Sequence, residues 1–325
     1  MYPMSQPILV PTSSQCTFDA LVIMGPTASG KTQLALDLAK EIPLEVISVD
    51  SVQVYRGMDI GTAKVTAEER KRVPHHLIDV RSVSDPYHLA AFLSEVESVL
   101  QGILKRGSLP VFVGGSGFYF EGLFRGLPPT PPLHQEARAK LERELEEEGV
   151  HSLYARLCSL DPQAASLLSK GDRHKIVRAL EVIEVTGQLL SSLRRQRQKK
   201  GLELRARLVR LESDRENLRQ KVLRRCDLML ERGLLEEVEG LIPQGIKENP
   251  AARTAIGYRH FLEYLDGHVS FDESVYFFKQ VSCQLIKKQE TWSRSRDRFV
   301  PVEVLASRKA LDRFMEQMCS WSTCV

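Results

Sequence analysis

The segment Gly25–Thr32 has the spacing G-x-x-x-x-G-K-T, which is typical of loops that bind phosphate groups. Its glycines let the backbone turn its amides inward, Lys31 adds a positive charge, and Thr32 can coordinate Mg²⁺. An apolar run, Leu21–Met24, precedes the segment, and apolar residues at helical spacing follow it. Because the motif requires this order of strand, loop and helix, we predict an anion site at a helix N-terminus.

Asp50 directly follows a second apolar run, Leu44–Val49. If the two predicted strands are neighbours, its carboxylate faces the phosphate loop, where such an acid holds Mg²⁺ or orients a nucleophile. A turn or helix-capping role is the alternative. Other polar residues surround Asp50 and can hydrogen-bond a planar base: Ser48, Ser51, Gln53 and Tyr55. The sequence therefore predicts a second substrate beside the phosphate groups.

Two further apolar runs, Leu77–Val80 and Pro110–Val113, alternate with amphipathic stretches such as Leu89–Leu104. The alternation predicts an α/β fold of the P-loop NTPase-like type, a parallel sheet flanked by helices. Gly114, Gly115 and Ser116 follow the run at 110–113, so a hydroxyl group and a closely approaching backbone are expected at the same edge. Three strand ends would then converge on one ligand.

Prolines in the segment 126–132 indicate a domain boundary, and the charged sequence after it has helical character. Residues 206–212 return to a strand-like pattern, which would let the chain re-enter the sheet. We therefore expect a disordered leader at 1–18, a core formed by 19–130 and 205–325 with a helical C-terminal part, and an inserted all-helical domain at 131–204.

The net charge of +3 over 325 residues does not mark the chain as a nucleic-acid binder, but basic residues are unevenly distributed. Residues 194–210 hold eight Lys or Arg and one Glu, and either attract phosphate or form a solvated helix and loop. Arg225 lies within two turns of Lys221 and Arg224 and either points at a phosphate group or lies on the surface. Basic and aromatic residues also interleave near the C-terminus, as in RNA-binding surfaces, although Trp292 suits a core equally well.

The six cysteines have no zinc-ligand spacing, and neither a secretion signal nor a membrane-spanning stretch is recognisable. These observations predict reduced thiols in a cytoplasmic protein that does not act in a membrane.

Several separate stretches, in this order, resemble the tRNA dimethylallyltransferases, also called tRNA isopentenyltransferases. They are GPTASGKT, SVDSVQVYRGMDIGTAK, PHHLIDV, FVGGSGFYF, DRHKIVRALEVIEVTG, LERGLLEEV, AIGYR and KKQETW. The resemblance implies transfer of a dimethylallyl group from dimethylallyl diphosphate to N6 of the adenosine immediately 3′ of the tRNA anticodon. The expected partners are therefore dimethylallyl diphosphate and the tRNA anticodon stem-loop, with Mg²⁺ as the cofactor and a monomeric enzyme.

The same resemblance assigns roles to individual residues. Asp50 is expected to be the general base, Ser116 and Arg225 to contact the diphosphate, and Thr32 to help hold Mg²⁺. The remaining diphosphate-binding residues are expected to be Gly25, Thr27, Ala28, Ser29, Gly30, Lys31 and Thr32, the last in addition to its role with Mg²⁺. The tRNA-contacting residues are expected to be Asp50, Ser51, Val52, Gln53, Arg138, His174, Lys175, Ile176, Val177, Arg178, Ile256, Gly257, Tyr258, Arg259, Lys287, Lys288, Trp292 and Arg294.

The chain departs from the family pattern at two of these regions. Ser116 replaces the usual threonine and keeps its hydroxyl group, so the role is expected to survive. In the frame T-R-x-x-A-K-R-Q-x-T-W the chain has Cys283 in place of arginine, together with Ser282, Ile286 and Lys288. Losing that arginine removes a possible phosphate contact. We therefore expect the phosphate groups to bind more weakly or through other residues nearby.

Two other functions share some of these features. One is an isopentenyltransferase acting on free AMP, ADP or ATP, against which the helical insert and the basic C-terminal third argue. The other is a small-molecule kinase, or an RNA-binding nucleotide switch, that binds ATP or GTP in the loop; triphosphate hydrolysis or phosphoryl transfer would distinguish it.

Overall fold

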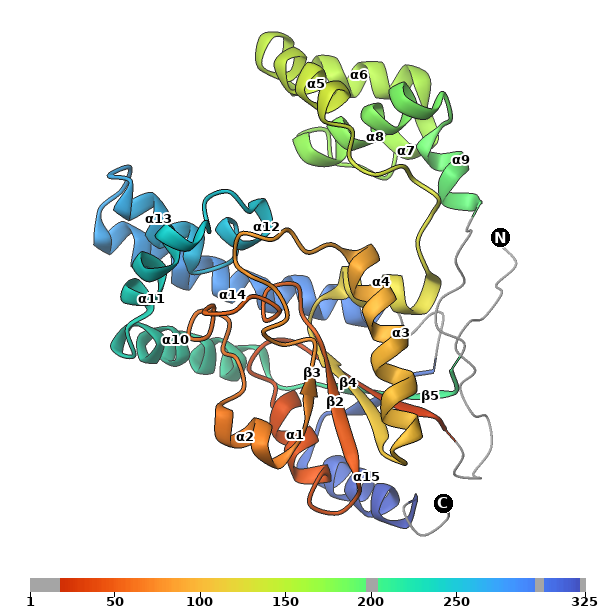
Figure 1. The fold of residues 1–325 in the computed structure, drawn as a ribbon, viewed down its shortest axis with the longest axis vertical. Coiled ribbons are helices and arrows are strands. Elements are labelled where there is room, and N and C mark those ends of the chain that lie inside the picture. The colour runs from red at the N-terminus through yellow and green to blue at the C-terminus, as the bar shows by residue number, and fades with distance from the viewer. Residues whose placement is uncertain (1–17, 197–203, 296–300, 322–325) are drawn as a thin grey trace. The chain divides into compact units, whose positions relative to one another are not determined.

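The computed structural model describes residues 18–196, 204–295 and 301–321 (Figure 1). It divides into two compact units: Met1–Phe124 together with Leu202–Val325, and Arg125–Gly201. The boundaries of the second unit differ by three to six residues from the insert predicted at 131–204. Residues 1–17 of the predicted leader lie outside the described residues.

A parallel sheet forms the centre of the first unit, with the strand order β3-β2-β4-β1-β5-β6. The strands are β1 (Ala20–Met24), β2 (Leu44–Val49), β3 (His75–His76), β4 (Leu109–Gly114), β5 (Ala206–Leu211) and β6 (Glu303–Leu305). Every residue of β1, β2 and β4 is buried, which explains their nearly continuous apolar sequences. The predicted fold class, a parallel sheet flanked by helices, is confirmed.

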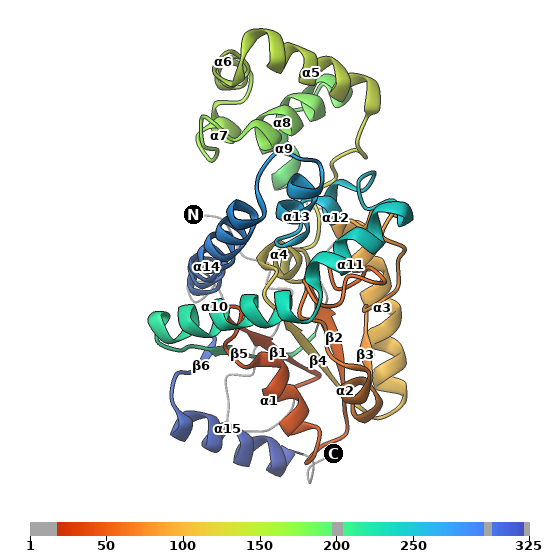
Figure 2. The same cartoon turned by 90° about the vertical axis from the view of Figure 1, so that its left-hand side faces the viewer.

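Helices cover both faces of this sheet. Helices α1 (Lys31–Leu38) and α15 (Arg308–Trp321) share one apolar cluster with strand residues such as Ile23 and Val111. Helix α3 (Leu89–Lys105) contacts β4, and Figure 2 shows it on the opposite side of the strands from α1. The other helices of this unit are α2 (Ala67–Arg72), α4 (Gly117–Arg125), α10 (Arg215–Glu231), α11 (Leu234–Leu241), α12 (Pro250–Arg253), α13 (Tyr258–Leu265), α14 (Phe271–Ser295) and the short 3₁₀ helix η1 (Ile242–Gln244).

The break between α10 and α11 follows from local sequence. Asp214 caps α10 by accepting a hydrogen bond from the Asn217 N–H. Gly233 has φ +91°, a left-handed conformation that glycine adopts without strain. The chain therefore ends one helix and starts the next at this residue.

The second unit is all-helical and has its own core. Its helices are α5 (Gln135–Glu148), α6 (Val150–Leu160), α7 (Pro162–Ala165), α8 (Arg173–Thr186) and α9 (Leu190–Arg195). Leu141, Leu157 and Leu180 are among the residues buried at its centre. Glu181 is also fully buried, where it accepts hydrogen bonds from the His134 N–H and the Arg178 guanidinium.

The apolar run Leu77–Val80 does not form a strand, so this prediction was wrong. Only His75 and His76 pair with β2, and both Leu77 (φ +61°) and Asp79 (φ +57°) then adopt left-handed backbone conformations. The Asp79 carboxylate pairs with Lys64 and Arg70, and the backbone N–H of Asp79 donates to the Gln53 carbonyl. These contacts with the neighbouring loop replace strand pairing.

Strands β1 and β2 are not neighbours, because β4 lies between them. The condition under which Asp50 was expected to face the phosphate loop is therefore not met, although the three strand ends remain adjacent. The short strand β6 and helix α15 also belong to the core and were not predicted from the sequence. Among the described helices, none is both long enough and apolar enough to span a membrane.

Candidate active site

A pocket of about 950 Å³ lies at the carboxyl ends of β1, β2 and β4. Its lining includes Lys31 and Thr32 after β1, Asp50 after β2, and Ser116 after β4, while α10 and α14 add further side chains. Parallel strands bring their carboxyl ends to one edge, which is why these distant segments meet. The predicted convergence of three strand ends is confirmed.

One side of the pocket consists of the phosphate loop and the start of α1. Gly30, at φ +95°, precedes the helix without a side-chain cap, so the first N–H groups of α1 are open to an anion. The Lys31 ammonium group donates to the Pro26 carbonyl over 2.7 Å. Burial lowers the pKa of Lys31 to about 8, with a further contribution from the charge of Arg225.

Arg225 reaches this loop from α10. Its Nη2 donates to Thr27 Oγ1 over 2.6 Å, whereas its buried Nε has no hydrogen-bond partner among the described residues. Burial lowers the pKa of the guanidinium group, and the neighbouring Lys221 and Arg224 are exposed. The hydroxyl group of Ser29 is likewise buried and unpartnered. These two unused polar atoms fit a site that is completed by an anion.

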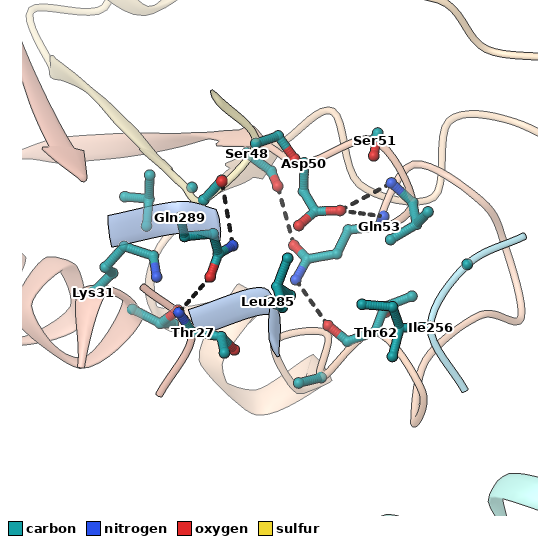
Figure 3. Close-up of a pocket in the computed structure, with 18 of the residues that line it drawn as sticks. Thr27, Lys31, Ser48, Asp50, Ser51, Gln53, Thr62, Ile256, Leu285 and Gln289 are labelled. Carbon is teal, nitrogen blue, oxygen red and sulfur yellow. Dashed lines mark hydrogen bonds between the residues drawn. The ribbon is translucent and has the colours of Figure 1, made fainter. Parts of the chain in front are cut away.

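Gln289 on α14 was missed from the sequence. Its Oε1 accepts a hydrogen bond from the Thr27 N–H over 2.7 Å, and its Nε2 donates to the Gly115 carbonyl over 3.2 Å (Figure 3). It thereby ties the phosphate loop to the end of β4. Its position in KKQETW, one of the stretches that resemble the family, could have identified it as a candidate site residue.

Asp50 lies on the other side of the pocket. Its Oδ1 accepts hydrogen bonds from the N–H groups of Val52 (2.9 Å) and Gln53 (3.3 Å), and Figure 3 draws no bond to its second oxygen from the residues shown. The turn role considered for Asp50 is therefore real and occupies one oxygen. Burial raises the pKa of Asp50, against the effect of these N–H groups and of Lys31 and Lys64. A raised pKa suits a carboxylate that accepts a proton during a reaction.

The side chain of Gln53 lies beside Asp50 and is fixed at both ends. Its Oε1 accepts from the Ser48 hydroxyl over 3.0 Å, and its Nε2 donates to the Thr62 carbonyl over 3.2 Å. Tyr55, by contrast, is fully buried, and its hydroxyl accepts from the Tyr87 N–H. The prediction that Tyr55 helps to bind a planar base was therefore wrong, because its side chain belongs to the core.

The structure divides the predicted tRNA-contacting residues of the first unit into two groups. The members that line the pocket are Asp50, Ser51, Val52, Gln53, Ile256, Lys288 and Trp292. Trp292 also packs in the core, where it stacks on Phe120 with ring centroids 5.8 Å apart. Arg259, Lys287 and Arg294 are exposed outside the pocket lining, and Arg294 hydrogen-bonds Glu212.

Tyr258 requires a correction. Its side chain is 0 % exposed, and its hydroxyl group donates to Glu237. Burial raises the pKa of this phenol, with a further contribution from the Glu237 carboxylate. Gly257 sets the start of α13 beside it, at φ +92°. The Tyr258 side chain cannot contact RNA in this conformation, because it fills the interior.

The predicted residues of the helical unit also differ in exposure. His174 and Lys175 are exposed at the start of α8, whereas Ile176 and Val177 are buried in the core of the unit. These two apolar side chains cannot contact RNA directly. Arg138 and Arg178 are partly buried and form ion pairs with Glu181.

Cys283 does not line the pocket. Its thiol lies near Arg219 of α10, and burial raises the pKa of the thiol. The neighbouring positions Ser282, Leu285 and Gln289 line the pocket instead. The expected loss of a phosphate contact at position 283 is therefore not supported by the direction of this side chain.

Comparison with known proteins gives consistent matches. Residues 53–296 match the family model described as IPP transferase. The chain is 44% identical over 276 residues to the tRNA dimethylallyltransferase of Chlamydia pneumoniae, covering 84% of this chain and 81% of that protein. The crystal structure of the full-length tRNA isopentenylpyrophosphate transferase from Bacillus halodurans matches with a TM-score of 0.65 and 34% identity, covering 94% of this chain and 99% of that chain. A eukaryotic dimethylallyltransferase acting on tRNA matches with a TM-score of 0.67 and 28% identity, covering 84% and 69% respectively.

Proposed function

The chain belongs to the IPP transferase family, and from this premise we propose that it transfers a dimethylallyl group from dimethylallyl diphosphate to a tRNA. The acceptor is N6 of the adenosine immediately 3′ of the anticodon, and diphosphate is released. The observation that carries the proposal is one pocket with an anion site on one side and a partly buried carboxylate, Asp50, on the other. Figure 3 shows Lys31 and Thr27 on the first side and Asp50 with Gln53 on the second.

The diphosphate binds at the phosphate loop. The N–H groups at the start of α1, the Lys31 ammonium group and the Arg225 guanidinium group supply donors and positive charge there. The unused Nε of Arg225 and hydroxyl of Ser29 gain partners when the anion binds. Ser116, at the start of α4, adds a hydroxyl group from the end of β4.

Mg²⁺ fits this site as a cation held mainly by the substrate. Among the described residues there is no cluster of three or more His, Cys, Asp or Glu side chains that could hold a metal. Mg²⁺ commonly takes only one or two protein ligands and completes its shell with phosphate oxygens and water. The Thr32 hydroxyl lines the pocket and would be such a ligand. When bound, the ion would supply positive charge next to the diphosphate.

Asp50 acts as the general base. The N6 amine of adenine is a weak nucleophile, so its proton must be accepted as the bond from N6 to the prenyl carbon forms. The bond from that carbon to the diphosphate oxygen breaks, and the diphosphate carries away its electron pair. Lys31 and Arg225 stabilise this developing charge, and the raised pKa of Asp50 favours acceptance of the proton.

The dimethylallyl group lies between the two polar sides. Leu285 lines the pocket, and Figure 3 shows it between the Thr27 and Gln289 pair and the Gln53 and Thr62 pair. An apolar side chain at this place suits a hydrocarbon group without competing for the polar groups on either side.

The tRNA presents an unstacked base to the pocket, since a base inside its stack cannot reach a carboxylate that lines a pocket. Lys288 and Trp292 on the pocket lining offer a positive charge and an aromatic ring for RNA. We also propose that the protein is a cytoplasmic monomer. Cys158, Cys226 and Cys283 form no disulfide among the described residues, as suits a reducing compartment.

The test is incubation of the purified protein with Mg²⁺ and radiolabelled dimethylallyl diphosphate, with either unmodified tRNA or AMP as acceptor. Wild type is compared with Asp50→Ala, and exposed Asp272→Ala serves as the matched control. Label on tRNA that is lost only in Asp50→Ala supports the proposal. Label on AMP alone would assign the protein to the enzymes that prenylate free nucleotides. No label on either acceptor, together with ATP hydrolysis, would favour a kinase or a nucleotide switch.

A further inference from the structure

Glu237 on α11 binds the backbone of a loop that is distant in sequence. Its Oε2 accepts hydrogen bonds from the N–H groups of Asp59 (3.0 Å) and Ile60 (2.7 Å), and its Oε1 accepts from the Gly61 N–H (3.2 Å). The Tyr258 hydroxyl donates to Oε1 as well. One carboxylate therefore takes four donors, three of them consecutive in the main chain.

Successive N–H groups that point to one place form a concave anion site, and here the protein fills that site with its own side chain. Hydrogen bonds to a carboxylate are stronger than those between neutral groups. Glu237 does not line the pocket, so any effect on the reaction must pass through the loop.

The loop lies close to the helices behind it. A Cβ atom added to Gly61 would lie 2.6 Å from the Tyr258 ring and 2.9 Å from Leu234. Lys64 anchors the far end of the loop, since its ammonium group donates to the Tyr55 carbonyl over 2.8 Å and pairs with Asp79. The loop thus has a defined position, and Gly61, Thr62 and Ala63 line the pocket from it.

The loop in turn holds the groups beside the general base. The Thr62 carbonyl accepts from Gln53 Nε2 over 3.2 Å, and the Gln53 N–H donates to Asp50 Oδ1 over 3.3 Å. Hydrogen bonds and the covalent backbone at 59–62 therefore link Glu237 to the Gln53 side chain, and the Gln53 backbone N–H in turn binds Asp50. We propose that Glu237 is a positioning residue for prenyl transfer, fixing Gln53 and Asp50 through this loop; the kinetic part of this inference rests on the proposed function.

The variant Glu237→Gln tests it, because glutamine keeps the volume but places an NH₂ group against backbone donors. Exposed Glu239→Gln on the same helix is the matched control, and Tyr258→Phe removes one donor and leaves the carboxylate. Amide hydrogen exchange is measured on the free protein by mass spectrometry. We expect exchange of the segment 59–61 to accelerate about ten-fold or more in Glu237→Gln and less in Tyr258→Phe, with no change in Glu239→Gln.

The same variants are assayed for transfer to tRNA. In Glu237→Gln we expect kcat to fall by about ten-fold while KM for dimethylallyl diphosphate stays unchanged, because the loop does not carry the diphosphate groups. Unchanged exchange at 59–61 would overturn the inference, and so would faster exchange with an unchanged kcat. An increase in KM for the diphosphate with an unchanged kcat would also contradict it. If wild type itself transfers nothing to tRNA, the proposed function fails, and the exchange data alone decide whether Glu237 holds the loop.

Discussion

The two sides of the pocket are built differently. The phosphate side combines main-chain N–H groups with Lys31, Arg225 and Gln289, which come from three separate parts of the sequence. The other side, which we call the acid side, contains Asp50. A hydrogen bond from Gln53, which is itself bonded to the adjacent loop, helps to fix the position of this carboxylate. In the proposed reaction, many donors bind the diphosphate on one side of the pocket, whereas one carboxylate accepts the proton on the other. Single substitutions should therefore have graded effects on binding and a much larger effect on turnover.

The largest effect is expected for Asp50→Asn. Asparagine has nearly the same shape and can still accept the hydrogen bonds from Val52 and Gln53, but it cannot accept the proton of the amine. We expect kcat to fall by roughly 10² to 10⁴. The Kd for dimethylallyl diphosphate, measured by calorimetry, should stay nearly unchanged. A weaker Kd with a normal kcat would assign Asp50 to binding and remove the contrast between the two sides.

A smaller effect is expected for Arg225→Gln. The variant removes a buried cation from the phosphate side, where a charged hydrogen bond contributes about 1.5–3 kcal/mol. We expect KM for dimethylallyl diphosphate to rise by about 10- to 100-fold in steady-state assays. The exposed neighbour Arg224 gives a matched control, and Arg224→Gln should bind the diphosphate like wild type. Equal losses in both variants would point to a general charge effect.

The pH dependence of kcat/KM should report separately on the two sides of the pocket, through Asp50 at low pH and Lys31 at high pH. Asp50 must be ionised, and its pKa is raised, so kcat/KM should increase with pH through a value above that of an ordinary aspartate. Lys31 must be charged, and its pKa is about 8, so kcat/KM should decrease above pH 8 by about ten-fold per pH unit. The bound diphosphate stabilises the charged lysine, so the decrease in kcat itself should move to higher pH. A profile without a decrease up to pH 10 would contradict the lowered pKa of Lys31.

Ser116 should contribute modestly. Loss of its hydroxyl in Ser116→Ala is expected to lower kcat/KM by about two- to ten-fold, the effect of one hydrogen bond. Ser116→Thr restores the residue that the family usually has and should match wild type. A full loss of activity in Ser116→Thr would show that the pocket has no room for the extra methyl group.

The smallest effect is expected for Cys283→Arg. The side chain at this position faces Arg219 on α10 and not the pocket, so an arginine there gains no phosphate contact. We expect KM for dimethylallyl diphosphate within about two-fold of wild type, as for most substitutions outside a site. A ten-fold decrease in KM would show that the new guanidinium group reaches the diphosphate.

The sequence predicted the elements that position the phosphate loop and Asp50. Buried parallel strands have continuous apolar sequences, so the runs at 21–24, 44–49 and 110–113 were recognisable, and the glycine spacing of the loop is specific. Leu77–Val80 is also mostly apolar, but it contains Asp79, whose ion pairs with Lys64 and Arg70 accompany a path outside the sheet. Such long-range pairs have no local signal.

Strand order and side-chain direction could not be predicted either. Nothing in the apolar runs places β4 between β1 and β2. Tyrosine is a residue type that often binds ligands, but the side chains of Tyr258 and Tyr55 fill the interior once the helices pack. Gln289 and Glu237 act through hydrogen bonds to backbone far away in the chain, and such contacts depend on the complete tertiary structure. Their helices were predictable, whereas their roles were not.

The order in which the pocket residues occur in the chain has a consequence for synthesis on the ribosome. The phosphate loop and Asp50 are made first, but Arg225, Glu237 and Gln289 follow only after the helical unit. At typical rates of translation, about 10 to 50 s separate Asp50 from Gln289. A nascent chain that ends before α14 has the anion-binding loop and the acid but lacks Gln289, which ties the phosphate loop to the end of β4. Catalytic competence therefore arises only near the end of synthesis, when the last third of the chain closes the pocket.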